Sequence, residues 1–192
     1  MKAYLQFRTY LFCLLLALPL GNAMADEDYS STIKIFQEAG ESASFFNNSY
    51  GYAVFPTIGK GGIGVGGAYG KGRVYAGGAW KGDTSMSQLS VGFQFGGQAY
   101  SQIIFFEDKR AYDEFTSGNF EFSADASAVA ITAGASASAG STGSAAGASA
   151  GKKDATTVGA YHKGMATFTV AKGGLMYEAV VAGQKFSYKP RQ

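Results

Sequence analysis

Hydrophobic and polar positions alternate over residues 50–106, where Val, Ile, Tyr and Phe recur at every second position among closely spaced glycines. This period is typical of strands, and the glycines allow bulges, bends and close approach of neighbouring backbones. Pro56 is expected to end the first strand, and Gly70-Lys71-Gly72 is expected to turn a hairpin between the second and third. The predicted strands in this stretch are 51–55, 63–69, 73–79, 89–95 and 99–106.

Two other segments repeat their apolar residues at the helical period. They are residues 28–39, with Tyr29, Ile33 and Phe36 on the inner face, and residues 107–117, with Ala111, Tyr112 and Phe115 on the inner face. The first helix is flanked by acidic residues, unlike the basic polar face of helices that enter membrane interfaces. We therefore expect it to pack on the sheet.

The remaining chain predicts short strands and one segment of very small side chains. Residues 123–151 consist almost wholly of Ala, Ser, Gly and Thr; the part up to about residue 139 predicts a strand, and the part after it predicts a mobile segment. The other predicted strands are 120–122, 156–162, 166–171, 175–181 and 185–189.

Strands outnumber helices in this pattern, and most connections are too short for parallel crossovers. We therefore predict an α+β domain in which a mainly antiparallel, strongly curved, barrel-like sheet carries a few short helices. The abundant small residues would let such a sheet bend sharply.

The N-terminal residues have the features of a secretory signal. Lys2 and Arg8 precede an apolar run that is short for a membrane span, and Ala23-Met24-Ala25 fits a cleavage site before Asp26. We expect residues 1–25 to be removed on export, leaving residues 26–192 as a single domain of the periplasm or cell envelope, peripheral to the membrane. The lone cysteine, Cys13, would be lost with the signal, so thiol and disulfide chemistry would be absent.

The distribution of charge is more informative than its total. The 16 basic residues include two in the signal, so the exported chain would carry 14 basic and 14 acidic residues. Yet no acid occurs between residues 42 and 82, and the chain from residue 155 onward is also basic, so folding could join the two regions.

An indole beside a cation is typical of a membrane-interface contact, and Trp80 precedes Lys81. Solvated surface lysines and a packed Trp80 are the ordinary alternative at each position taken alone. As a group, the residues predicted to contact anionic phospholipid headgroups are Lys60, Lys71, Arg73, Trp80 and Lys81.

The sequence offers little for catalysis or for a cofactor. His162 is the single histidine, and nucleophilic catalysis needs a base that is oriented by a third group. The sequence does not match a P-loop, because Val65 occupies the position of its first glycine and Gly72 occupies the position of its Ser or Thr after Lys71. We predict a protein that is not an enzyme and that binds no metal, nucleotide or nucleic acid.

An ordered series of motifs resembles the SYLF domain family, a lipid-binding domain also called the yeast actin-patch regulator domain. The motifs are GYAVFP at 51–56, KGGIGVGG at 60–67, GFQFGGQAY at 92–100, FEDKRAYDEF at 106–115, AYHKG at 160–164 and KGGL at 172–175. The resemblance implies a non-catalytic domain that binds phospholipids, with phosphoinositide preference and actin association in eukaryotic members. The first helix lacks a basic face and an exported chain would not meet actin, so we do not expect an actin partner.

Two other functions stay open at this point. The glycine and aromatic alternation and the size of the chain also suit a small outer-membrane β-barrel of eight strands. The helix at 107–117 and a C-terminus without an aromatic residue argue against it. An enzyme that uses His162 is the other alternative.

Overall fold

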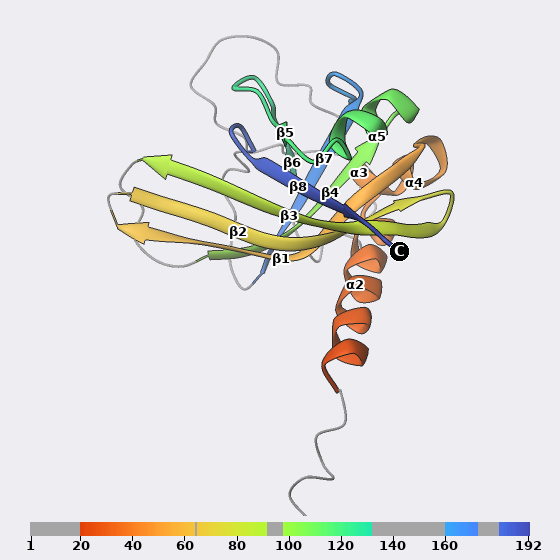
Figure 1. Cartoon of the computed structure of the whole chain (residues 1–192), viewed down its shortest axis with the longest axis horizontal. Coiled ribbons are helices and arrows are strands. Elements are labelled where there is room, and N and C mark those ends of the chain that lie inside the picture. Colours follow the sequence, from red (N-terminus) through yellow and green to blue (C-terminus); the bar gives the residue numbers. More distant parts are fainter. Residues whose placement is uncertain (1–19, 64, 92–97, 132–159, 173–180) are drawn as a thin grey trace, which may run out of the picture.

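The computed structural model describes residues 20–63, 65–91, 98–131, 160–172 and 181–192. The strands in this part of the chain form one sheet with the order β5-β8-β3-β2-β1-β4-β7-β6 (Figure 1). They are β1 (Gly51–Ile63), β2 (Val65–Ala76), β3 (Ala79–Val91), β4 (Gln98–Phe106), β5 (Phe120–Glu121), β6 (Val129–Ile131), β7 (Met165–Lys172) and β8 (Lys185–Pro190).

Strand pairing confirms the predicted fold class. Neighbouring strands run antiparallel except β6 and β7, which run parallel. The helices among the described residues are α2 (Leu20–Glu38), α3 (Gly40–Ala43), α4 (Phe45–Asn48) and α5 (Lys109–Phe115). The strand predicted at 175–181, most of that at 156–162 and most of the small-residue segment lie outside the described residues.

The sheet curls over one face, which we call the inner face. The ring centroids of Phe55 on β1 and Phe186 on β8 are 5.7 Å apart, although β2 and β3 separate these strands in the sheet. Phe115 of α5 also packs against Phe186, at 5.0 Å. The curled sheet therefore encloses an apolar core on this side, as expected for a large buried aromatic cluster.

The opposite, outer face is covered at one end by α2, α3 and α4. Phe36 of α2 and Phe45 of α4 belong to a second apolar cluster with Val54, Phe105 and Phe168 of the sheet. The predicted packing side of the first helix is confirmed, because Tyr29 and Ile33 also contact this cluster on the outer face of the sheet. The helix begins at Leu20, earlier than predicted. None of the described helices has the length and apolar composition that a membrane crossing requires.

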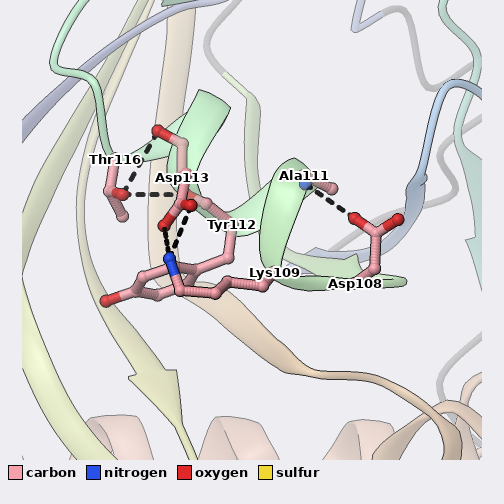
Figure 2. Close-up of polar contacts among 6 residues, drawn as sticks. All are labelled: Asp108, Lys109, Ala111, Tyr112, Asp113 and Thr116. Atoms are coloured by element: carbon pink, nitrogen blue, oxygen red, sulfur yellow. Dashed lines mark hydrogen bonds and ion pairs between the residues drawn. The ribbon is translucent and has the colours of Figure 1, made fainter.

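The second predicted helix is confirmed as α5, with shorter bounds. Asp108 caps it by accepting a hydrogen bond from the Ala111 backbone N–H at 2.8 Å (Figure 2). Lys109 lies one turn before Asp113 and forms an ion pair with it at 2.6 Å on the solvent side. The acidic residues of this helix therefore form a solvated face, while Ala111 and Phe115 are buried.

The predicted hairpin at Gly70-Lys71-Gly72 is wrong. β2 runs without interruption from Val65 to Ala76, and the turn into β3 lies at Gly77-Gly78, which have φ values of 59° and 74°. Gly70 and Gly72 face inward, where a Cβ on Gly72 would lie 2.6 Å from the Phe55 ring. These glycines therefore serve close packing against β1 instead of a reversal of the chain.

The prediction that Pro56 ends the first strand is wrong. β1 continues to Ile63 through a bulge, with a register shift between Val54 and Thr57. Proline has no N–H to give to a ladder, and a bulge accommodates that loss. The Pro56 carbonyl instead accepts a hydrogen bond from the Ser101 hydroxyl at 2.7 Å. The bulge also shifts the alternation of side chains between the two faces of the sheet. Phe55 and Ile58 both point inward although they are three residues apart, an odd spacing that would place them on opposite faces of a regular strand.

The far ends of β1, β2 and β3 extend past the other described elements (Figure 1). We call residues 61–63, 65–69 and 88–91 the tongue. β4 pairs with β1 only as far as Lys60, and β8 pairs with β3 only as far as Ser87. Three strands are therefore left to form the tongue, with both of its edges free of neighbouring described strands.

Gly72→Ala is expected to destabilise the protein, because the new Cβ would collide with Phe55 and with the Val54 carbonyl. The expected loss in free energy of unfolding is about 1–3 kcal/mol, measured by urea denaturation. Gly59→Ala is the matched control, since nothing lies within 4 Å of a Cβ there. Equal stability of the two variants would contradict the packing role assigned to Gly72.

Candidate functional site

Arg73 stands at the centre of a stack of cations and aromatic rings on the outer face. Its guanidinium carbon lies 4.3 Å from the centroid of the Tyr29 ring and 3.9 Å from that of Trp80. The guanidinium of Arg191 lies 4.2 Å from the Trp80 ring. Such contacts are attractive because the ring face carries negative charge. We call Tyr29, Arg73, Trp80 and Arg191 the outer stack.

The outer stack joins four parts of the chain: α2, β2, β3 and the C-terminal residues. Trp80 is half-buried and donates its indole N–H to the Gly82 carbonyl at 3.0 Å. Burial raises the pKa of Tyr29 to about 12, with Arg73 opposing the shift and Asp83 adding to it. The Tyr29 ring is therefore neutral at physiological pH, and it holds α2 on the sheet beside Arg73.

Other cations of the outer face come from distant parts of the sequence. Lys189 on β8 is opposite Asp83, and Asp83 is opposite Arg73, so these three side chains share one face. Lys71 is opposite Thr57, whose hydroxyl accepts a hydrogen bond from the Lys172 ammonium at 2.7 Å. We call Lys71, Arg73, Lys172, Lys189 and Arg191 the outer basic cluster.

Two acids accompany the outer basic cluster. Lys172 lies 3.8 Å from Asp28 of α2, and Asp83 is placed between Arg73 and Lys189 by the strand register. Counted with these two acids, the five cations of the outer basic cluster carry a net positive charge. The expectation that folding brings the two basic regions of the sequence together is confirmed, since Lys172, Lys189 and Arg191 all come from the second region.

The five residues predicted from the sequence do not form a single patch. Lys71, Arg73 and Trp80 share the outer face, and Lys81 lies exposed at the bulge that precedes Gly82. The Lys81 carbonyl accepts hydrogen bonds from the Tyr188 hydroxyl at 3.1 Å and the Arg191 N–H at 2.8 Å. Lys60 is opposite the inward-facing Ala68, and it therefore lies on the inner face.

A shallow hollow of about 560 Å³ lies at the base of the tongue. An ion pair between Lys185 and Glu121, 3.5 Å apart, stands at this hollow. Gln88 also faces it and donates a hydrogen bond to the Ala182 carbonyl at 2.8 Å. The residues that line the hollow are Gly59, Gly67, Ala68, Tyr69, Ser87, Gln88, Leu89, Glu121, Gly183 and Lys185.

The inner face holds a polar pair that is fully buried. The side-chain amides of Gln102 and Gln184 exchange hydrogen bonds of 2.9 and 3.1 Å, and Gln184 also donates to the Tyr100 hydroxyl at 3.2 Å. Burial raises the pKa of Tyr100 to about 12. These groups satisfy one another, so they fix the packing of β4 against the turn before β8.

His162 lies in an exposed network of polar contacts that links the segment before β6 to the turn before β7. Its Nε2 is 3.0 Å from Asp125, whose carboxylate also contacts Lys163 and Ser123. Ser123, Lys163 and His162 together hold the pKa of Asp125 well below its usual range. The Ser123 hydroxyl contacts Asp125 and Lys163, so Ser123 and His162 are linked through the Asp125 carboxylate.

Comparison with known proteins identifies the class of this domain. The model of the Ysc84 family, described as "Las17-binding protein actin regulator", matches residues 87–188. The match covers more than half of the chain, and the chain belongs to this family of SYLF domains, as its motifs indicated. The family is one of lipid- and actin-binding domains and not of enzymes.

A curated relative is the Beta cell expansion factor A of Aeromonas veronii. It is 27% identical over 176 residues, which cover 86% of this chain and 54% of the relative. The chain therefore spans about half the length of the relative that it matches.

The contact between Tyr29 and Arg73 is expected to stabilise the docking of α2. A double-mutant cycle with Tyr29→Leu and Arg73→Gln should give a coupling energy of about 0.5–1 kcal/mol in urea denaturation, because the cycle removes the other contacts of each residue from the difference. A cycle that pairs Tyr29→Leu with Lys189→Gln is the control and should give a smaller coupling. A coupling of zero for Tyr29 and Arg73 would contradict the outer stack.

Proposed function

We propose that this protein is a non-catalytic phospholipid-binding protein of the bacterial envelope. Its outer basic cluster contacts the phosphate groups of anionic lipids electrostatically. Membership of a lipid-binding family supports the choice of ligand. The observation that carries the proposal is the convergence of Lys71, Arg73, Lys189 and Arg191 on one face, from strands far apart in the sequence.

The energetics favour a collective contact. Each cation near an anionic membrane surface contributes about 1 kcal/mol to the binding free energy. One lysine therefore gives weak binding, whereas several cations together give substantial binding. Arg73 and Arg191 are held in place by the Trp80 ring, so they lose little side-chain freedom on binding. Lys71, Lys189 and Lys81 are exposed and able to adjust to mobile headgroups.

The proposal includes export through the N-terminal signal. Cleavage after Ala25 would leave the packing face of α2 in the exported chain, since Tyr29, Ile33 and Phe36 follow that position. The exported domain would therefore keep the helix that covers the outer face, and the helix contributes Tyr29 to the outer stack.

Charge reversal at exposed cluster positions tests the proposal. Lys71→Glu with Lys189→Glu should weaken co-sedimentation with vesicles of phosphatidylglycerol and phosphatidylcholine by about 30-fold or more, because two contributions of about 1 kcal/mol are lost. Binding of the unaltered protein should also weaken as salt is added.

The matched control is Lys109→Glu with Lys163→Glu, which changes the net charge equally but alters α5 and the turn before β7. It should retain most of the binding. Equal losses in both double variants would assign binding to bulk charge and contradict a role for the cluster. An unaltered protein that does not sediment with these vesicles would contradict the proposed function itself.

A further inference from the structure

The tongue exposes three large apolar side chains. The exposed fractions are 66% for Val65, 54% for Tyr69 and 86% for Leu89. The register places Leu89 opposite Gly67, between Val65 and Tyr69 on the same face, and Gly67 has no side chain to cover them. We call Val65, Tyr69 and Leu89 the apolar tip. Exposed apolar side chains that gather in one place mark a contact surface.

Lysines follow the apolar tip on both faces of the tongue. Lys60 is opposite Ala68 on the inner face, and Lys71 follows Tyr69 on the outer face. Lys60 lies at the level of Ala68, three residues from Val65, which is about 10 Å along a strand. Lys60 therefore lies behind Val65 and Leu89 and close to the level of Tyr69, and Lys71 lies two residues behind Tyr69.

The charge around the tip favours an anionic surface as the partner. The tongue segments 61–63, 65–69 and 88–91 contain no Asp or Glu. Glu121, at the hollow at the base of the tongue, is paired with Lys185. The tongue also extends past the other described elements, so its end can reach a flat surface before they do (Figure 1). An apolar end backed by cations and free of acids matches the order of layers in an anionic bilayer.

We propose that the apolar tip enters the interface of an anionic bilayer. Val65 and Leu89 then lie below the phosphate groups, the Tyr69 hydroxyl stays at headgroup level, and Lys60 and Lys71 contact phosphates from the two faces of the tongue. This inference rests on the proposed function and deepens it. It also gives a role to Lys60, which the outer basic cluster does not include.

Site-specific labelling tests the insertion on the full chain. Cys13 is the one cysteine, so Cys13→Ser with Leu89→Cys carries one environment-sensitive nitrobenzoxadiazole label. Vesicles of phosphatidylglycerol and phosphatidylcholine in equal parts should shift its emission to the blue, and lipids with a quencher on the acyl chain should quench it. The same label at Asn119→Cys, exposed beyond α5, is the control and should show neither effect.

Removal of the apolar side chains gives a second measurement. Val65→Ser with Leu89→Ser should lower co-sedimentation with the same vesicles about tenfold or more, because this apolar area no longer leaves water. Ile35→Ser is the control, since Ile35 is an exposed apolar residue of α2, away from the tongue, and should bind normally. Circular dichroism checks that each variant is folded.

The outcomes separate this inference from the proposed function. Salt-sensitive sedimentation with a Leu89 label that stays in water would overturn insertion and leave the headgroup contact standing. Absence of sedimentation for the unaltered chain would overturn both. A blue shift without vesicles that grows with protein concentration would show that the tip contacts a second copy of the chain, and insertion would again be overturned.

Discussion

The curl of the sheet depends on the close approach of the β1 side chains to glycines of β2. Ile58 and Phe55 occupy the space that a Cβ at Gly70 and Gly72 would take. With these side chains drawn against β2, the sheet closes over Phe186 and fills its inner face with apolar residues. Burial of the inner face leaves Lys71 and Arg73, the alternate residues of β2, to the outer face. The inward packing of these two glycines thus accompanies the outward placement of Lys71 and Arg73.

Much of the fold could be predicted from the sequence because its signals are local. Alternation indicated β7 and most of β4, and helical spacing indicated that Phe36 and Phe115 are buried. The hairpin at residues 70–72 was wrong because glycine has two uses, and the local pattern does not separate a turn from a close contact. The contact that decides the matter comes from Phe55, on a neighbouring strand. The turn itself uses Gly77 and Gly78, with positive φ.

The sequence predicted some residues of the candidate site, such as Lys71 and Arg73, but it did not predict which other cations lie beside them. The bulge at Pro56 reverses the alternation of β1, so that Lys60 faces inward with Ile58 instead of outward. A count of residues along a regular strand gives the opposite face. Lys189 and Arg191 join the site only through the pairing of β8 with β3, which links positions about a hundred residues apart. Such pairing leaves no local mark on the sequence beyond an excess of basic residues near the C-terminus.

Hydrogen–deuterium exchange of the full chain, with and without phosphatidylglycerol vesicles, tests most directly whether the outer face and the tongue form the lipid-binding surface. The account predicts that vesicles slow exchange in peptides that cover residues 65–73 and 185–191, and leave exchange in α5 unchanged. Slower exchange at α5 and at the turn of residues 161–164, with residues 65–73 unaffected, would contradict it, because the membrane would then meet the opposite side of the curled sheet.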